Sequence, residues 1–88
     1  MKLQGEFVVR QVLDDVVAIP VGQTALKVGG MILLNDVSRV IWNCLETGTT
    51  EEAILTAITD AFAVSDEEAR ADIAEFLDQL RSAQLLQE

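Results

Sequence analysis

The side chains of this chain that could do chemistry are few and poorly grouped. The sequence of 88 residues has no histidine and a single cysteine, Cys44. It therefore lacks the usual general base, the usual imidazole metal ligand and the Ser-His and Cys-His nucleophile pairs. A single cysteine also excludes an internal disulfide and a cysteine-based zinc site within one chain. We expect neither a cofactor nor a metal.

The remaining candidates for catalysis each have a structural explanation. Cys44 lies on the apolar stripe of a predicted helix, without a nearby His or Lys to lower its pKa, so we interpret it as a buried, inert thiol. The glutamate pairs at 51–52 and 67–68 fall in predicted first turns of helices, where capping and the helix dipole favour acids. The glycine pair at 29–30 is not followed by the residues of a phosphate-binding loop. A small catalyst using Cys44 or a carboxylate is therefore the least favoured hypothesis, and we expect no enzyme.

Charge is distributed unevenly along the sequence. The chain has 15 acidic and 6 basic residues, and the excess of nine acids lies entirely in residues 35–88. A phosphate backbone would be repelled by such a surface, so no nucleic-acid partner is expected. No apolar stretch approaches the ~20 residues of a membrane span, and the start does not resemble a signal peptide. We expect a cytoplasmic protein without a membrane partner.

The first 34 residues have the pattern of strands. Runs rich in β-branched residues at 7–13 and 16–19 predict a hairpin with a turn at Asp14 and Asp15. Pro20 lacks an N–H and should end the second strand or lie on an edge. Residues 21–28 fit either a long hairpin loop or a short extra strand. A strand at 24–28 would cover the edge of the next predicted strand, at 31–34, and the sequence does not decide this.

Residues 36 to about 83 have the pattern of three helices. The first begins after Asn35, a suitable N-cap, and its apolar residues follow helical spacing. The second is predicted to begin with Thr49 and Glu52 as a capping box, and the third with Ser65 and Glu68. The chain thus predicts one α+β domain over residues 1–88. It is winged-helix-like, with a small antiparallel three-stranded sheet at about 6–34 followed by a three-helix bundle at about 36–83.

Two surfaces could bind a partner. An edge strand offers unpaired backbone groups to which a peptide can add as a further strand. In the third helix, a small residue, an apolar residue and two cations lie along one line, offset from the core, although such a line is also typical of a solvated flank. Trp42 fits either the rim of a core or a partner contact. The helix residues of this line are Arg70, Ala74, Leu77 and Arg81.

Several blocks of the sequence together resemble one known family. These blocks are Gly30-Met31-Ile32-Leu33-Leu34-Asn35, Ile41-Trp42, Thr50-Glu51-Glu52-Ala53-Ile54, Ala71-Asp72-Ile73-Ala74-Glu75-Phe76-Leu77, Leu80 and Leu85-Leu86. In this order and spacing they are similar to the PqqD-like family, small domains also called recognition elements for ribosomally synthesised precursor peptides. Residues 36–38 replace the usual Glu-Thr-Gly, Ala83-Gln84 replaces the usual Gly, and residues 21–30 are longer than the usual turn.

The resemblance implies a non-catalytic module that binds the leader segment of a precursor peptide and presents it to a modifying enzyme. Such an enzyme would be a radical SAM enzyme, a cyclodehydratase or a protease. The resemblance places the leader as a strand in the cleft between the third strand and the third helix. The implied contacts are Met31, Ile32, Leu33 and Leu34 on the strand, with Arg70, Ala74 and Leu77 on the helix. Arg81 extends the same helical line.

Two further hypotheses remain open from the sequence. A winged-helix domain that binds DNA or regulates another protein shares the same topology, although acidic helices argue against DNA. A homodimer could form through the sheet's own open edge. The precursor, the enzyme and the final product are not identified by these residues.

Overall fold

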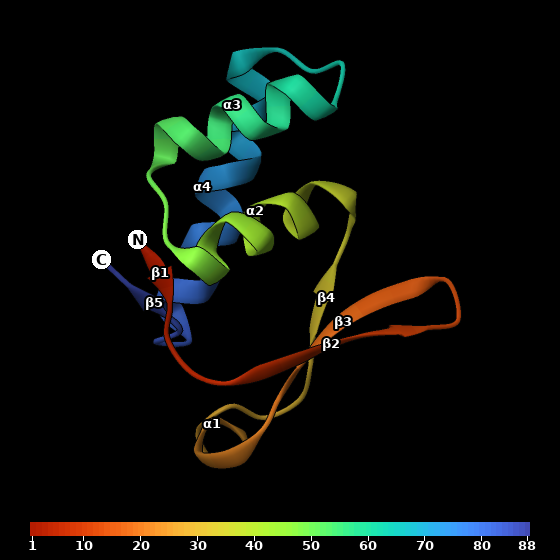
Figure 1. The fold of residues 1–88 in the computed structure, drawn as a ribbon, viewed down its shortest axis with the longest axis vertical. Coiled ribbons are helices and arrows are strands. Elements are labelled where there is room, and N and C mark those ends of the chain that lie inside the picture. Colours follow the sequence, from red (N-terminus) through yellow and green to blue (C-terminus); the bar gives the residue numbers. More distant parts are fainter. The chain divides into compact units, whose positions relative to one another are not determined.

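The computed structural model describes residues 1–88, which form two compact units (Figure 1). The helical unit comprises Met1–Gln4 and Asp36–Glu88, and the sheet unit comprises Gly5–Asn35. The elements in chain order are β1 (Lys2–Leu3), β2 (Phe7–Val12), β3 (Asp15–Pro20), α1 (Gly22–Lys27), β4 (Ile32–Leu34), α2 (Asp36–Thr47), α3 (Glu51–Ala61), α4 (Asp66–Ser82) and β5 (Leu86–Gln87).

The helical unit is built from the three long helices, whose apolar stripes supply its buried residues. α3 contacts both α2 and α4. Leu45 on α2, Ile58 on α3 and Leu80 on α4 are completely buried, as helical spacing predicts. Burial of such a side chain contributes roughly 1.5–3 kcal/mol, so these stripes hold the helices together. None of the four helices is long and apolar enough to span a membrane.

The two ends of the described chain meet in the helical unit. β1 and β5 pair antiparallel, with Leu3 opposite Leu86, and form a separate two-stranded sheet that the sequence does not predict. The amide of Gln4 donates to the carbonyl of Leu85 at 2.8 Å, and the amide of Thr49 donates to the carbonyl of Met1 at 2.8 Å. Figure 1 shows both ends side by side near the end of α2. The first residues are therefore fixed to the helices by backbone hydrogen bonds.

Side-chain caps set where two of the helices begin. At α4 the predicted N-cap Ser65 is present: the amide of Glu68 donates to Ser65 Oγ at 3.1 Å, and the Ser65 hydroxyl donates to Glu68 Oε1 at 3.1 Å. At α3 the predicted cap is wrong by one residue. Thr50, not Thr49, is the N-cap, and its Oγ1 accepts from the amide of Ala53 at 3.2 Å. Either threonine could cap a helix, and the start of α3 decides which one does.

The sheet unit is a three-stranded antiparallel sheet in the order β2-β3-β4. β3 ends at Pro20, as predicted. The hairpin turn is Leu13-Asp14 rather than Asp14-Asp15, because Val12 pairs with Asp15 and leaves only two residues between them. In Figure 1 this turn and α1 lie at opposite ends of the sheet unit.

Residues 22–27 are the main departure from the predicted fold. They form the short helix α1, so neither the loop nor the extra strand expected for residues 21–28 is present. The buried Thr24 anchors this helix, since its Oγ1 accepts from the amide of Glu6 at 2.8 Å. Gly5 makes room for the contact, because a Cβ there would lie 2.8 Å from Thr24 Oγ1. The α+β class is confirmed, with α1 and the β1–β5 pair added to it.

Candidate functional site

β4 is an edge strand of the sheet and pairs only with β3. Because residues 24–28 belong to α1 and the turn after it, no strand from that segment covers the open side of β4. Gly30 has φ +84, a conformation that glycine adopts readily, and it precedes the exposed Met31 at the start of this segment. The uncertainty left by the sequence is therefore resolved in favour of an uncovered edge.

The two edges of this sheet differ in side-chain chemistry. β2, the other edge strand, carries the exposed polar residues Arg10 and Gln11. β4 carries only apolar residues, Ile32, Leu33 and Leu34. Charged side chains on an edge discourage pairing with another chain, whereas an uncharged apolar edge favours it. Of the two edges, β4 is therefore the better template for an added strand.

Side chains of β4 alternate between a buried face and an exposed face of the sheet. Ile32 and Leu34, which pair with Ala18 and Val16, are 8% and 4% exposed. Leu33, on the opposite face, is 62% exposed. The strand is thus fixed by two buried anchors while one side chain and one row of backbone groups remain open to a partner.

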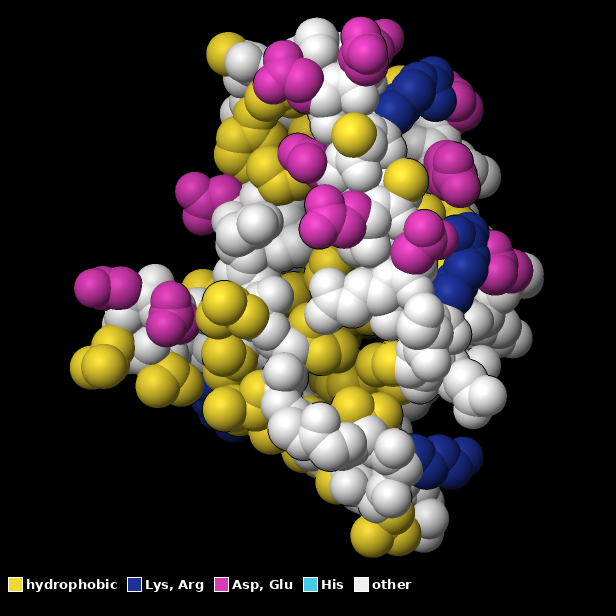
Figure 2. Space-filling view, turned by 180° about the vertical axis from the view of Figure 1, so that it is seen from behind, with side chains coloured by type: hydrophobic (Ala, Val, Ile, Leu, Met, Phe, Trp, Pro, Cys, Tyr) yellow, Lys and Arg dark blue, Asp and Glu magenta, His cyan; other side chains and the backbone are white.

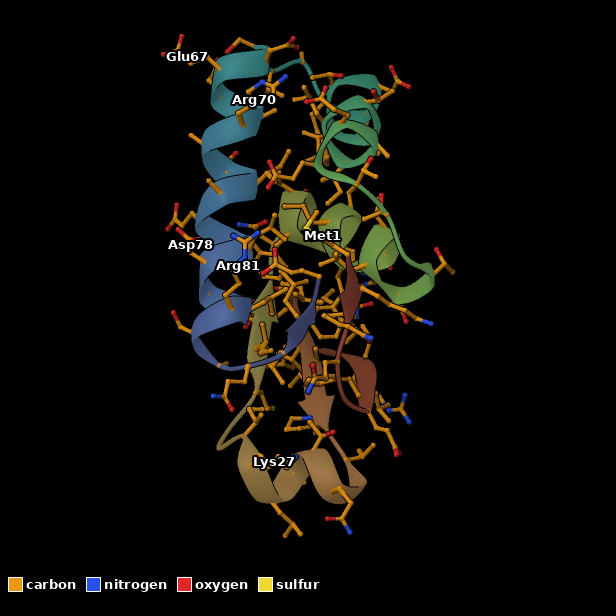
Figure 3. All side chains as sticks on the ribbon, turned by 90° about the vertical axis from the view of Figure 1, so that its left-hand side faces the viewer. Met1, Lys27, Glu67, Arg70, Asp78 and Arg81 are labelled. Carbon is orange, nitrogen blue, oxygen red and sulfur yellow. The ribbon has the colours of Figure 1, made fainter.

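The two arginines predicted as binding residues on α4 are engaged in ion pairs within the helical unit. Arg70 Nη1 lies 3.2 Å from Glu52 Oε1 on α3, rather than pairing along its own helix. Arg81 contacts Asp78 at 3.2 Å, Glu88 at 2.8 Å and Glu51 at 3.9 Å. Figure 3 shows Arg70 and Arg81 on α4, with Arg81 next to Asp78. Both guanidinium groups are therefore already paired with carboxylates of the helical unit.

Two short, strong contacts join Arg81 to Glu88. Nη2 donates to Oε1 at 2.8 Å and Nε donates to Oε2 at 3.1 Å, a bidentate geometry. The hydrogen bond from Arg81 lowers the pKa of Glu88 below its ordinary value, against a smaller opposing effect of desolvation. The hydrogen bond to Glu88 likewise raises the pKa of Arg81. Arg81 therefore has a structural role in this unit, holding the residues that follow α4.

The other two predicted helix residues differ in exposure. Ala74 is exposed, whereas Leu77 is 1% exposed and belongs to the core. A small pocket of about 130 Å³ lies next to this line, bordered by Glu51, Arg70 and Ile73. Of the four residues, only Arg70 and Ala74 offer freely accessible surface.

The structure shows how far the residues considered for catalysis, metal binding or a partner contact are buried. Trp42 is 1% exposed, so it packs inside the core rather than at its rim. Cys44 is only half-buried, so the expectation of a buried thiol was too strong. No three Cys, Asp or Glu side chains are grouped closely enough to hold a metal ion.

The sequence did not indicate a concentration of exposed apolar side chains that lies on the sheet unit. These exposed large hydrophobic residues are Val12, Leu13, Leu26, Met31 and Leu33. Figure 2 shows apolar side chains gathered on the sheet unit, whereas most of the acidic side chains lie on the helical unit. Strict alternation in the strands would have identified Leu33, but the exposure of Leu13 depends on the exact turn, which the sequence placed one residue too late.

Comparisons with known proteins agree with this architecture. The family model described as coenzyme PQQ synthesis protein D (PqqD) matches residues 12–86. A solved structure described as TbiB1 in complex with the TbiA(beta) leader peptide matches with a TM-score of 0.75 and 30% sequence identity. The match covers 99% of this chain and 95% of the other, and it confirms the winged-helix-like α+β fold. No curated protein gives a significant match. The chain belongs to the PqqD family, the peptide-recognition elements that its strand and helix blocks resemble.

Proposed function

We propose that this protein binds the leader segment of a ribosomally made precursor peptide, which adds as a strand to the open edge of β4. The observation that carries the proposal is the edge itself, which is uncovered, uncharged and anchored by Ile32 and Leu34. The solved complex of TbiB1 with a leader peptide supports it, because that protein shares the fold and 30% of the sequence.

Strand addition would supply affinity and selectivity from different groups. Backbone hydrogen bonds along β4 are made with any extended peptide, so they add affinity without distinguishing sequences. Alternate peptide side chains then lie on the same face as Leu33, where apolar and β-branched side chains form favourable cross-strand pairs. A leader with an apolar residue opposite Leu33 should be preferred over one with a charge there.

On α4, Arg70 and Ala74 remain proposed peptide contacts. The Arg70–Glu52 ion pair is exposed at both ends, and such pairs contribute about 0–1 kcal/mol. An acidic side chain of a leader could therefore replace Glu52 at little cost. Leu77 is buried and Arg81 is bound by three acids, so a change at either would alter the fold as well as any contact.

The protein itself would not catalyse a reaction. It would hold the leader while a separate modifying enzyme, such as a radical SAM enzyme, a cyclodehydratase or a protease, acts on the rest of the precursor. The three long helices carry most of the acidic excess, which disfavours DNA as the partner.

The proposal is tested by NMR titration of the labelled protein with the leader of a precursor encoded beside its gene. Saturable shifts centred on residues 30–34 are expected. Leu33→Pro should weaken binding by ~10-fold or more, because proline removes a backbone donor and disturbs the strand. Leu33→Ile, which keeps an apolar side chain suited to a strand, is the matched control. Helical circular dichroism should be the same for all three proteins, and an absence of saturable binding to any neighbouring short peptide would refute the proposal.

A further inference from the structure

The hairpin tip between β2 and β3, defined by residues 12–15, presents an apolar side chain to solvent. Leu13 is 89% exposed, the largest exposure among the large hydrophobic residues, and its neighbour Val12 is 49% exposed. Leu13 occupies the first position of the two-residue turn, since Val12 pairs with Asp15. Figure 2 shows apolar and acidic side chains together at this projecting tip, on the left of the view.

The backbone conformation makes leucine an unfavourable choice at this position. Leu13 has φ +58, a left-handed conformation that brings its Cβ close to the following carbonyl oxygen. Two-residue hairpin turns favour glycine or asparagine at such positions. The side chain is almost fully exposed, so it adds little to the packing of the sheet. Neither the turn nor the core accounts for a leucine here, which indicates a contact outside the chain.

The charges beside Leu13 restrict the kind of partner. Asp14 and Asp15 follow it directly, and neither takes part in an ion pair of this structure. The nearest basic residue on β2, Arg10, donates to the carbonyl of Val9 at 3.3 Å. An apolar side chain next to two unpaired carboxylates is complementary to an apolar recess bordered by Lys or Arg.

We propose that the hairpin tip docks the modifying enzyme, through a recess on that enzyme that is apolar inside and basic at its rim. This inference rests on the proposed function, because it gives the enzyme a place on the molecule that holds the leader. β3 connects the two sites, since Val16, next to the tip, pairs with Leu34 of β4. An enzyme seated at the tip would therefore lie beside one end of the proposed leader strand.

A second copy of the chain and a membrane both fit the tip less well. Two copies meeting tip to tip would bring four carboxylates together, and each copy has a net charge of −9. An anionic lipid surface would be repelled by the same acids. A basic-rimmed protein surface is the partner that uses both the leucine and the acids.

The test uses the full chain, the leader peptide of the neighbouring precursor and the purified modifying enzyme encoded with them. Leu13→Asn keeps a residue that accepts positive φ but removes the apolar side chain. It should weaken enzyme association by ~10-fold or more, as expected for a buried apolar anchor, while leader affinity stays within ~2-fold. Leu26→Asn is the matched control, since Leu26 is another exposed leucine of the sheet unit, and it should leave both affinities within ~2-fold.

The remaining measurements separate the alternatives. Asp14→Lys should also weaken enzyme association and reduce its dependence on salt concentration. Equal enzyme affinities for the Leu13→Asn and Leu26→Asn variants would overturn the proposal, as would concentration-dependent dimerisation of the unaltered protein that Leu13→Asn abolishes. If the unaltered protein bound no leader yet still bound the enzyme through Leu13, the proposed function would fail while the docking tip would stand.

Discussion

The helical unit and the sheet unit differ in how far their apolar side chains are buried and in whether their charged side chains form ion pairs. The helical unit leaves no large apolar residue fully exposed and pairs its α4 arginines with its own acids. All of the exposed large hydrophobic residues lie instead in the sheet unit, within residues 5–35. The sheet unit also has an edge strand that no other strand covers.

This difference shows where function and stability are separated in a small molecule. Side chains that satisfy one another inside a unit contribute to folding and leave little for a partner. Exposed apolar side chains and unpaired backbone groups contribute little to folding, but they stabilise a complex when a partner covers them. The comparison therefore assigns stability mainly to the helices and recognition mainly to the sheet, and the following predictions test that assignment.

The largest expected effect distinguishes a core leucine from an edge leucine. Leu45→Ala should lower the free energy of unfolding by ~2–5 kcal/mol, because Leu45 is completely buried and its truncation leaves a cavity. Leu33→Ala should change it by less than ~0.5 kcal/mol but weaken leader binding. Urea unfolding and peptide titration of both variants measure the contrast. Comparable destabilisation by the two substitutions would contradict the separation of roles.

A smaller effect concerns the start of α3. Thr50→Ala should lower the free energy of unfolding by ~1 kcal/mol, since it leaves the amide of Ala53 without its cap. Thr49→Ala is the matched control, because the Thr49 hydroxyl bonds only the carbonyl of Thr50, at 3.3 Å. Thermal unfolding should rank the two variants in that order. If the Thr49 variant proved the less stable of the two, the cap would be misassigned.

The two threonines illustrate how far sequence could define the fold. Helical periodicity located every long helix, because a buried face enforces that period, and runs of β-branched or apolar residues located the three sheet strands. Boundaries were less certain, since adjacent residues such as Thr49 and Thr50 are chemically alike. α1 was missed because it has no side-chain cap and depends on Thr24, whose partner Glu6 is 18 residues away. Contacts of that range are not encoded in a local pattern.

For the candidate site, sequence predicted the edge strand better than the helix residues. The family resemblance indicated an edge at Met31–Leu34, where β4 lies, but only the structure shows that residues 24–28 form no strand beside it. On α4, spacing placed Arg70 and Arg81 on one line but could not show that acids of α3 lie within reach of both. Leu77 fitted both the apolar stripe and the line, and only its burial shows that it is core. Whether such residues are available to a partner depends on contacts with residues far away in the sequence, which a local pattern does not show.

A substitution at the hairpin tip should raise the free energy of unfolding, whereas the loss of a helix cap lowers it. Leu13→Asn should raise the free energy of unfolding by up to ~1 kcal/mol, because asparagine tolerates φ +58 better than leucine does. Thermal unfolding would register this as a few degrees, at roughly 4–8 °C per kcal/mol for a domain of this size. Val12→Asn, in the adjoining strand, should instead lower stability. A destabilised Leu13→Asn variant would show that the leucine serves the fold itself.

The smallest expected effect is a pH dependence of the segment that follows α4. Glu88 has its pKa lowered by the hydrogen bond from Arg81, so the folded state binds this proton less tightly than the unfolded chain does. The contribution of the pair to stability is therefore present above the ordinary glutamate pKa of about 4.3 and is lost as pH falls through the lowered value. The raised pKa of Arg81 adds no second transition below the alkaline range.

Acidification should consequently loosen the β1–β5 pairing before it affects the helix core. The Gln4 amide donates to the carbonyl of Leu85, and its protection relative to the intrinsic exchange rate at each pH should fall as Glu88 becomes protonated. Glu88→Gln should remove that pH response, and high salt should weaken it, because both partners are accessible to solvent. An unchanged protection factor through the titration of Glu88 would mean that backbone pairing alone holds the two ends. The Arg81–Glu88 ion pair would then contribute to the surface charge of the helical unit but not to the pairing of β1 with β5.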